Sequence, residues 1–362
     1  MNNSTKDQID NAKNPLRTIE QQKILESKSR LAFLDILRFV AAFIVVVAHM
    51  YDSNVPNQGF STFDLKKDFS IFHTGVAGVI IFFLISGYIM PSAITRCNDI
   101  KDFLIKRCIR IYPLLIAVMI YGVVRYGGFK EKMILGLILP IADFIRGISV
   151  VKGVDWTLRV EFFYYVLIAL IYFKNKFNLK TTLFCIATTS ILIVITYLCS
   201  EKYFNYRLIY LNFIFLGSLL YLIEKENFSN FGNNTWTLVT FISSITIFEI
   251  CRVDDIYLFP GMLFGTAIFL FFYFLHQTKF GIKSNSFVTF LGDLSYPSYL
   301  LHLMIYEDLY RLSNSHIATP ILFVIICYGA HLFIEKPSMK KLKKVFSAPN
   351  NVLFSNSKVQ LK

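Results

Sequence analysis

Long apolar runs separated by short polar connections cover most of the chain. A membrane-crossing helix needs about 20 apolar residues, and flanking residues can extend a shorter run. The candidate runs are 33–51, 74–91, 111–124, 162–173, 182–199, 206–223, 236–250, 257–276, 289–306 and 319–334. This pattern predicts an all-α polytopic membrane protein with about ten transmembrane helices. A further run at 133–145 is short and contains Pro140, so we expect it to be re-entrant or interfacial.

The composition favours a membrane protein over a soluble one. Hydrophobic residues make up 55% of the chain, charged residues only 17%, and the mean hydropathy is +0.52. Soluble domains carry about a quarter charged residues. The 6 cysteines form no Cys-x-x-Cys pair, which argues against a disulfide framework or a structural zinc site. No metal site is expected.

The net charge of +13 lies in the connections rather than in a patch that would bind nucleic acid. Basic residues gather in 96–110, 174–180, 279–283 and 340–344. Under the positive-inside rule these segments are cytoplasmic. Both termini are then cytoplasmic, provided that 133–145 does not cross the membrane. The basic residues of 125–132 oppose this assignment, because it places them outside.

The chain divides into one membrane domain and two polar ends. Residues 1–30 are polar and mixed in charge, which indicates a cytoplasmic arm rather than a signal peptide. Residues 31–337 form the membrane domain, and 338–362 form a basic cytoplasmic tail. No internal repeat is visible.

Arg38 and His49 interrupt the first apolar run. They are 11 positions apart, so they lie about 20° apart on one helix face and about 16 Å apart along its axis. A charged residue within a span costs about 2.5–3.5 kcal/mol and usually faces a partner or a cavity. The alternative is that Arg38 pairs with Asp35 and that His49 caps the outer helix end.

Other apolar runs also carry polar residues that suggest a site. Structural alternatives exist for three of these groups. The polar stripe within 289–306 would then form interhelical hydrogen bonds. The residues at the start of 162–173 would interact with the helix dipole or anchor the helix at the membrane interface, and the arginines before 111–124 would serve only as positive-inside charge. Arginines at the start of a helix also suit phosphate binding. The residues are Ser86, Arg107, Arg110, Trp156, Glu161, Ser295, Tyr299 and His302.

Five segments in order resemble the acyltransferase-3 family of bacterial integral-membrane O-acyltransferases. RFVAAFIVVVAH is similar to its arginine–ten residues–histidine signature, and GVAGVIIFFLISGY to its second-helix motif. RCIRIYP, WTLRVEF and LGDLSYPSYLLH are similar to three further motifs, and the resemblance covers roughly residues 31–337. Tyr88 replaces the usual Phe, and Ile80 stands where many members carry Asp.

The resemblance implies a ten-helix core and an activity. Members transfer an acyl group, usually acetyl, from cytoplasmic acyl-CoA to a hydroxyl of an extracytoplasmic or lipid-linked glycan, such as O-antigen, capsule or exopolysaccharide. The expected location is the bacterial cytoplasmic (inner) membrane. The expected partners are acyl-CoA, the glycan acceptor and membrane lipids, with acetyl-CoA as donor substrate and no permanently bound cofactor.

The same chemistry gives each candidate residue a role. His49 would act as general base or carry the acyl group, Arg38 would bind the donor's anionic parts or the thioester carbonyl, and Glu161 would orient a histidine or bind sugar hydroxyls. Arg107 and Arg110 would bind acyl-CoA. The expected surroundings of the acceptor are Ser86, Trp156, Ser295, Tyr299 and His302.

Two other functions fit intramembrane Arg, His and Glu residues. One is a transporter or flippase of a glycan intermediate, which should show repeated halves. The other is a non-catalytic membrane partner in glycan assembly, which would tolerate loss of His49.

Overall fold

The computed structural model describes residues 32–49, 74–127, 154–175, 177–199, 202–225, 258–277 and 284–347. Within these ranges all regular structure is helical, as predicted. The helices are Ala32–His49, α4 (Thr74–Ile94), α5 (Ile100–Tyr126), α7 (Asp155–Asn175), α8 (Leu179–Leu198), α9 (Lys202–Lys225), α11 (Leu258–Gln277), α12 (Ser286–Ser313), α13 (Ala318–Ala330) and α14 (Lys336–Ser347). A π-helical turn, His331–Glu335, joins α13 to α14.

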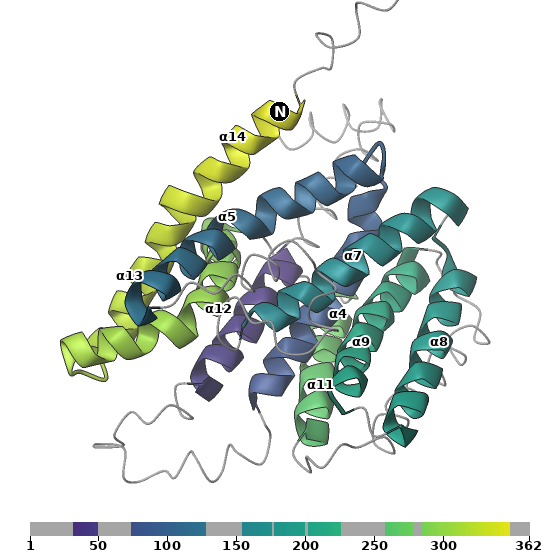
Figure 1. Cartoon of the computed structure of the whole chain (residues 1–362), viewed down its shortest axis with the longest axis horizontal. Helices are drawn as coiled ribbons and strands as arrows, with labels where there is room; N and C mark the ends of the chain where they lie inside the picture. The colour runs from purple at the N-terminus through teal and green to yellow at the C-terminus, as the bar shows by residue number, and fades with distance from the viewer. Residues whose placement is uncertain are drawn as a thin grey trace, which may run out of the picture.

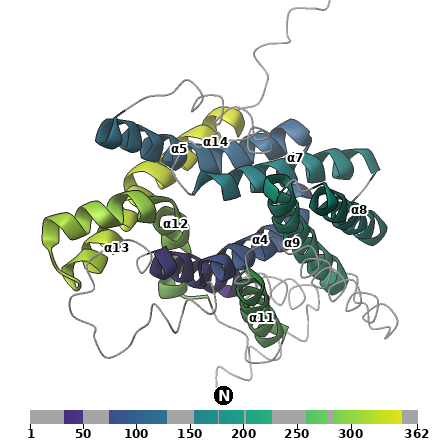
Figure 2. The ribbon, with the colours of Figure 1, turned by 60° about the horizontal axis from the view of Figure 1, so that its bottom comes forward.

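Helix α4 lies at the centre of the bundle. Helices α9 and α11 pack against it, and α8 packs on the far side of α9 (Figure 1). Helices α12 and α13 lie on the other side of α4, as the turned view shows (Figure 2). The Ala32–His49 helix passes between α4 and α12, because Gly78 of α4 lies against Ala41 and Gly292 of α12 lies against Asp35.

Six of the described helices are long and apolar enough to cross a membrane, so the chain is a multi-pass membrane protein. Their apolar segments are Ala32–His49, Gly75–Ile94, Asp155–Lys174, Leu179–Leu198, Arg207–Lys225 and Ala318–Lys341. Each predicted span other than 236–250 overlaps a described helix. The runs 236–250 and 133–145 and the arm 1–30 lie outside the described residues.

Contacts spaced along the helices fix their relative directions. Along α4, Phe83 and then Tyr88 meet Tyr210 and then Tyr221 of α9, so the two helices run parallel. By the same criterion α7 and α11 run parallel to α4. The Ala32–His49 helix, α5 and α12 run the opposite way.

These directions gather basic side chains at one end of the bundle, which we call the basic end. Its described members are Arg96, Lys101, Lys106, Lys174, Lys180, Lys225, Lys336, Lys340 and Lys341. At the opposite end, Arg125 pairs with Asp308 at 2.9 Å and Arg311 pairs with Glu307 at 2.5 Å. The charge of Arg125 is therefore neutralised locally, although its position in the sequence opposed the predicted topology.

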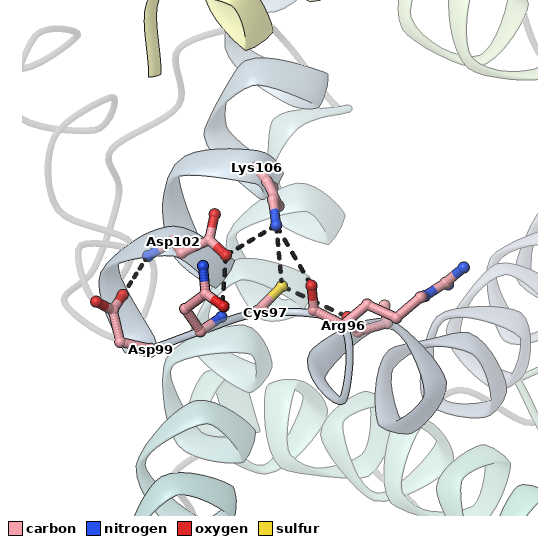
Figure 3. A network of polar contacts seen from close by, with 7 residues as sticks. Arg96, Cys97, Asp99, Asp102 and Lys106 are labelled. Carbon is pink, nitrogen blue, oxygen red and sulfur yellow. Dashed lines mark hydrogen bonds and ion pairs between the residues drawn. The ribbon is translucent and has the colours of Figure 1, made fainter. Parts of the chain in front are cut away.

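A polar turn at the basic end joins α4 to α5 and begins α5 (Figure 3). The Asp99 carboxylate accepts a hydrogen bond from the Asp102 amide at 2.7 Å and caps the helix. Lys106 Nζ donates to Asp102 at 2.8 Å and approaches the Arg96 carbonyl at 3.5 Å. Partial burial raises the pKa of Asp102, but the hydrogen bonds from Lys106 and Asn98 outweigh it and leave that pKa below its usual value.

Helices α4 and α9 approach each other at backbone distance. A Cβ on Gly217 would lie 2.2 Å from the Leu84 carbonyl oxygen, and one on Gly87 would lie 1.8 Å from the Ile214 carbonyl oxygen. Small residues permit such contact between membrane helices, where packing rather than hydrophobicity drives association. Ser218 strengthens the contact, because its hydroxyl donates to the Gly87 carbonyl at 3.0 Å.

Replacing Gly217 should therefore destabilise the bundle. Gly217→Ala places a methyl group against backbone that cannot move aside, so we expect the free energy of unfolding to fall by about 3 kcal/mol, the upper end for overpacking. Denaturant titration of the purified protein in mixed micelles measures this loss. Gly75→Ala is the matched control, because its Cβ would meet only side-chain atoms at ordinary distances, Ala48 Cβ at 3.4 Å and His49 Cε1 at 4.0 Å. Equal stability of the two variants would contradict the close packing.

Candidate active site

A cavity lies where the Ala32–His49 helix, α4, α5, α7 and α12 meet. It encloses about 830 Å³ of empty space, counting the part that opens to solvent. The candidate residues on its wall are Arg38, Ser86, Arg107, Arg110, Glu161, Ser295 and Tyr299. Residues up to 261 positions apart in sequence (299 minus 38) thus share one site.

Glu161 of α7 is held in place by two hydroxyl groups. Ser86 of α4 and Tyr165, one turn further along α7, both donate hydrogen bonds to the same carboxylate oxygen. Tyr165 is not among the residues predicted from the sequence, although its i, i+4 spacing from Glu161 is a visible signal.

Three arginines give the basic side of the cavity its charge. Arg38 forms an ion pair with Asp35 at 3.1 Å, as in the structural alternative, and it also lies on the cavity wall; its role stays a prediction. The Arg107 guanidinium lies 5.4 Å from the ring centre of Phe103, and its buried Nε has no hydrogen-bond partner among the described residues. Arg110 is exposed and lies on the wall too. This side of the cavity suits an anionic ligand.

Tyrosine and threonine hydroxyls line the opposite part of the cavity. The Tyr299 and Thr157 hydroxyls share a hydrogen bond of 2.6 Å between α12 and α7. The ring of Phe82 meets that of Tyr299 edge-on at 5.1 Å. Ser295 donates to the Gly292 carbonyl of its own helix at 2.6 Å, so its O–H is already used and its oxygen remains an acceptor.

His49 and His302 stack on each other beyond Tyr299. Their ring centres are 5.1 Å apart and their planes differ by 3°. Among the described residues, neither histidine belongs to the cavity wall, but Tyr299 does, and His302 follows it by one turn of α12. His49 therefore faces α12, and Arg38 on the same helix shares the cavity wall with Ser295 and Tyr299 of α12.

Trp156 supports the site from behind rather than lining it. Its ring packs against Tyr210 at 4.9 Å and Phe83 at 6.3 Å. The Arg207 guanidinium lies 4.4 Å from the centre of the Trp156 ring, a cation–π contact. Phe83 lies on the cavity wall, so Trp156 packs behind a residue of the wall. A direct acceptor contact for Trp156 stays a prediction.

The polar groups follow an order from the basic end inwards. Arg38 is 6 residues from Ala32 and Arg107 is 7 residues from Ile100, so each lies about 10 Å inside that end. Glu161 and Tyr299 follow, and the two histidines lie closer to the opposite end. In the described part of the chain, no group of His, Cys, Asp and Glu residues is arranged to hold a metal ion.

Comparison with known proteins identifies the family to which the chain belongs. Residues 31–334 match a family described as an acyltransferase domain. The chain is 31% identical over 159 residues to nodulation protein 10 of Rhizobium leguminosarum bv. viciae, covering 36% of this chain and 41% of that protein. It is 30% identical over 162 residues to the O-acetyl transferase of Shigella phage Sf6, covering 39% and 46%. The chain thus matches less than half the length of either relative. No solved structure matches.

Gly292 should be needed to hold Asp35 against Arg38. A Cβ at this position would lie 2.7 Å from Cγ and 2.8 Å from Cβ of Asp35. We expect Gly292→Ala to push Asp35 away and to lower the free energy of unfolding by about 1–3 kcal/mol. Gly329→Ala is the control, because its Cβ would meet nothing within 4 Å. Denaturant titration measures both variants, and equal stability would show that Asp35 tolerates the methyl group.

Proposed function

Because the chain belongs to the acyltransferase-3 family, we propose that it transfers an acetyl group from cytoplasmic acetyl-CoA to a hydroxyl of an extracytoplasmic or lipid-linked glycan. The observation that carries this proposal is the cavity wall, which combines Arg38, Arg107 and Arg110 with the hydroxyl-bound Glu161. The relative named as an O-acetyl transferase supports acetyl as the group and oxygen as the acceptor atom. The family membership favours this function over a transporter or a non-catalytic partner.

In this proposal the arginines bind the donor. The phosphates of acetyl-CoA are anionic, and guanidinium groups bind phosphate oxygens through two parallel hydrogen bonds. Arg107 and Arg110 are close to the basic end, where a cytoplasmic donor would enter. Arg38 lies at a similar depth on its own helix, beside Asp35, and would polarise the thioester carbonyl as charge develops on its oxygen.

The acceptor hydroxyl reacts at the other side of the cavity. Glu161 and the Tyr299–Thr157 pair offer hydrogen-bonding groups that match a sugar hydroxyl. His49 and His302 lie next to them and would take the proton of that hydroxyl or carry the acyl group. A cavity lined by helices lets polar donor and acceptor meet within the membrane without exposing helix backbone to lipid.

The proposed topology places the basic end in the cytoplasm of a bacterial inner membrane. The clustering of basic residues at one end of the described bundle supports it, because cytoplasmic loops carry excess Lys and Arg. The parallel course of α9 and α11 fits one further crossing between them, within the predicted run 236–250. Helix α5 ends and α7 begins at the same end of the bundle. This is expected if the segment 133–145 does not cross the membrane. With ten spans, both termini are cytoplasmic.

Reporter fusions test this topology. Fusions after Lys180 and after Lys344 should report a cytoplasmic position, and a fusion after Asn314 should report an extracytoplasmic one. An alkaline phosphatase and fluorescent protein pair provides opposite signals for the two sides. An extracytoplasmic signal from the Lys180 fusion would rule out the ten-span arrangement.

Loss of Arg107 and Arg110 tests the proposed donor site. Each charge-assisted hydrogen bond contributes about 1.5–3 kcal/mol, so Arg107→Gln combined with Arg110→Gln should weaken acetyl-CoA binding by about tenfold or more. Calorimetry on purified protein in lipid nanodiscs gives the Kd. Lys101→Gln is the charge control, because Lys101 is exposed at the same end and off the cavity wall. An unchanged Kd in a correctly inserted double variant would reject the donor site.

A further inference from the structure

His302 has one ring nitrogen in a hydrogen bond and the other buried without a partner among the described residues. Its side chain is buried, with 4% of its surface exposed. Nδ1 lies 2.6 Å from the Tyr299 carbonyl oxygen. A carbonyl oxygen only accepts hydrogen bonds, so this contact assigns the ring proton to Nδ1. In a neutral ring, Nε2 then carries a lone pair.

That lone pair has no hydrogen-bond partner in the described part of the chain, although Nε2 is fully buried. A buried polar atom without a partner is costly, and native proteins retain few of them. A protonated ring would be worse, because it would bury a charged N–H at Nε2 without an acceptor. The position therefore suits a neutral imidazole that gains its partner from a substrate.

The surroundings of His302 hold the ring in one orientation. The Tyr299 carbonyl anchors one edge, and the parallel ring of His49 covers one face at 5.1 Å. Tyr299 also lines the cavity through its own side chain. A backbone acceptor on one nitrogen and a free lone pair on the other is how enzymes prepare histidine to accept a proton.

We propose that His302 is a catalytic residue of the acyl transfer, with Nε2 as the general base for the acceptor hydroxyl. This inference rests on the proposed function. As the hydroxyl oxygen attacks the thioester carbonyl, Nε2 takes the hydroxyl proton. The new C–O bond forms, the C–S bond breaks, and the CoA thiolate leaves. The imidazolium then returns the proton to the thiolate, which yields free CoA thiol and the neutral histidine.

The experiment compares two nucleophiles with acetyl-CoA as the donor and purified full-length protein in lipid nanodiscs. Water must lose a proton to attack, whereas hydroxylamine attacks without base assistance. Release of CoA thiol above the protein-free rate measures both reactions. We expect His302→Ala to slow the reaction with water by about 10²–10⁴-fold and to leave the hydroxylamine reaction largely intact. Added imidazole should restore part of the water reaction.

Two further variants separate chemistry from folding. His302→Gln keeps a polar side chain but provides no base, so it should show the same selective loss. His316→Ala removes an exposed histidine far from the cavity and should change neither reaction. Equal loss of both reactions in both His302 variants, or retention of the water reaction, would overturn the role of His302. A parent protein inactive with both nucleophiles would instead overturn the proposed function, and the role of His302 with it.

Discussion

The backbone-level fit of α4 against its neighbours determines where the candidate site forms. Gly87 of α4 and Gly217 of α9 bring the two helices together, and Gly265 of α11 lies against Ala77 of α4. Helix α4 also carries Ser86, which donates to Glu161 on α7. A shift of α4 by the width of a methyl group would therefore separate two walls of the cavity. Packing of this kind stabilises membrane helices where the hydrophobic effect cannot.

Charge compensation inside the bundle is the second constraint. A charged residue in a span costs about 2.5–3.5 kcal/mol, so the charges of the cavity gather near one another. Arg38 has Asp35, and Glu161 has two hydroxyl donors. Arg107 remains incompletely satisfied, since its buried Nε has no partner among the described residues. An anionic donor would complete this set, which connects the stability of the bundle to its proposed activity.

The helices, and the helix faces that carry the candidate residues, could be predicted from the sequence because both depend on local pattern. The 11-residue spacing of Arg38 and His49 was enough to place them on one helix face. It could not show that Asp35 would meet Gly292, since no periodicity reports a contact between distant helices. The predicted span 111–124 was shorter than α5, because charged residues at the start of α5 satisfy one another and extend the helix. The roles of the site residues stay predictions.

The order of groups along the cavity separates the parts of the proposed donor. The phosphates of CoA would bind among the arginines near the basic end, whereas the thioester must lie within reach of both the acceptor hydroxyl and His302. The attacking oxygen and the sulfur are bonded to the same carbon in the tetrahedral intermediate, so Nε2 of His302 can return the proton to the sulfur directly. Between the arginines and His302 lie the Tyr299–Thr157 hydroxyl pair and the Ser86–Glu161–Tyr165 cluster, all groups that can donate or accept hydrogen bonds. The cavity wall would therefore bind the donor along its length and bring its thioester to the histidine.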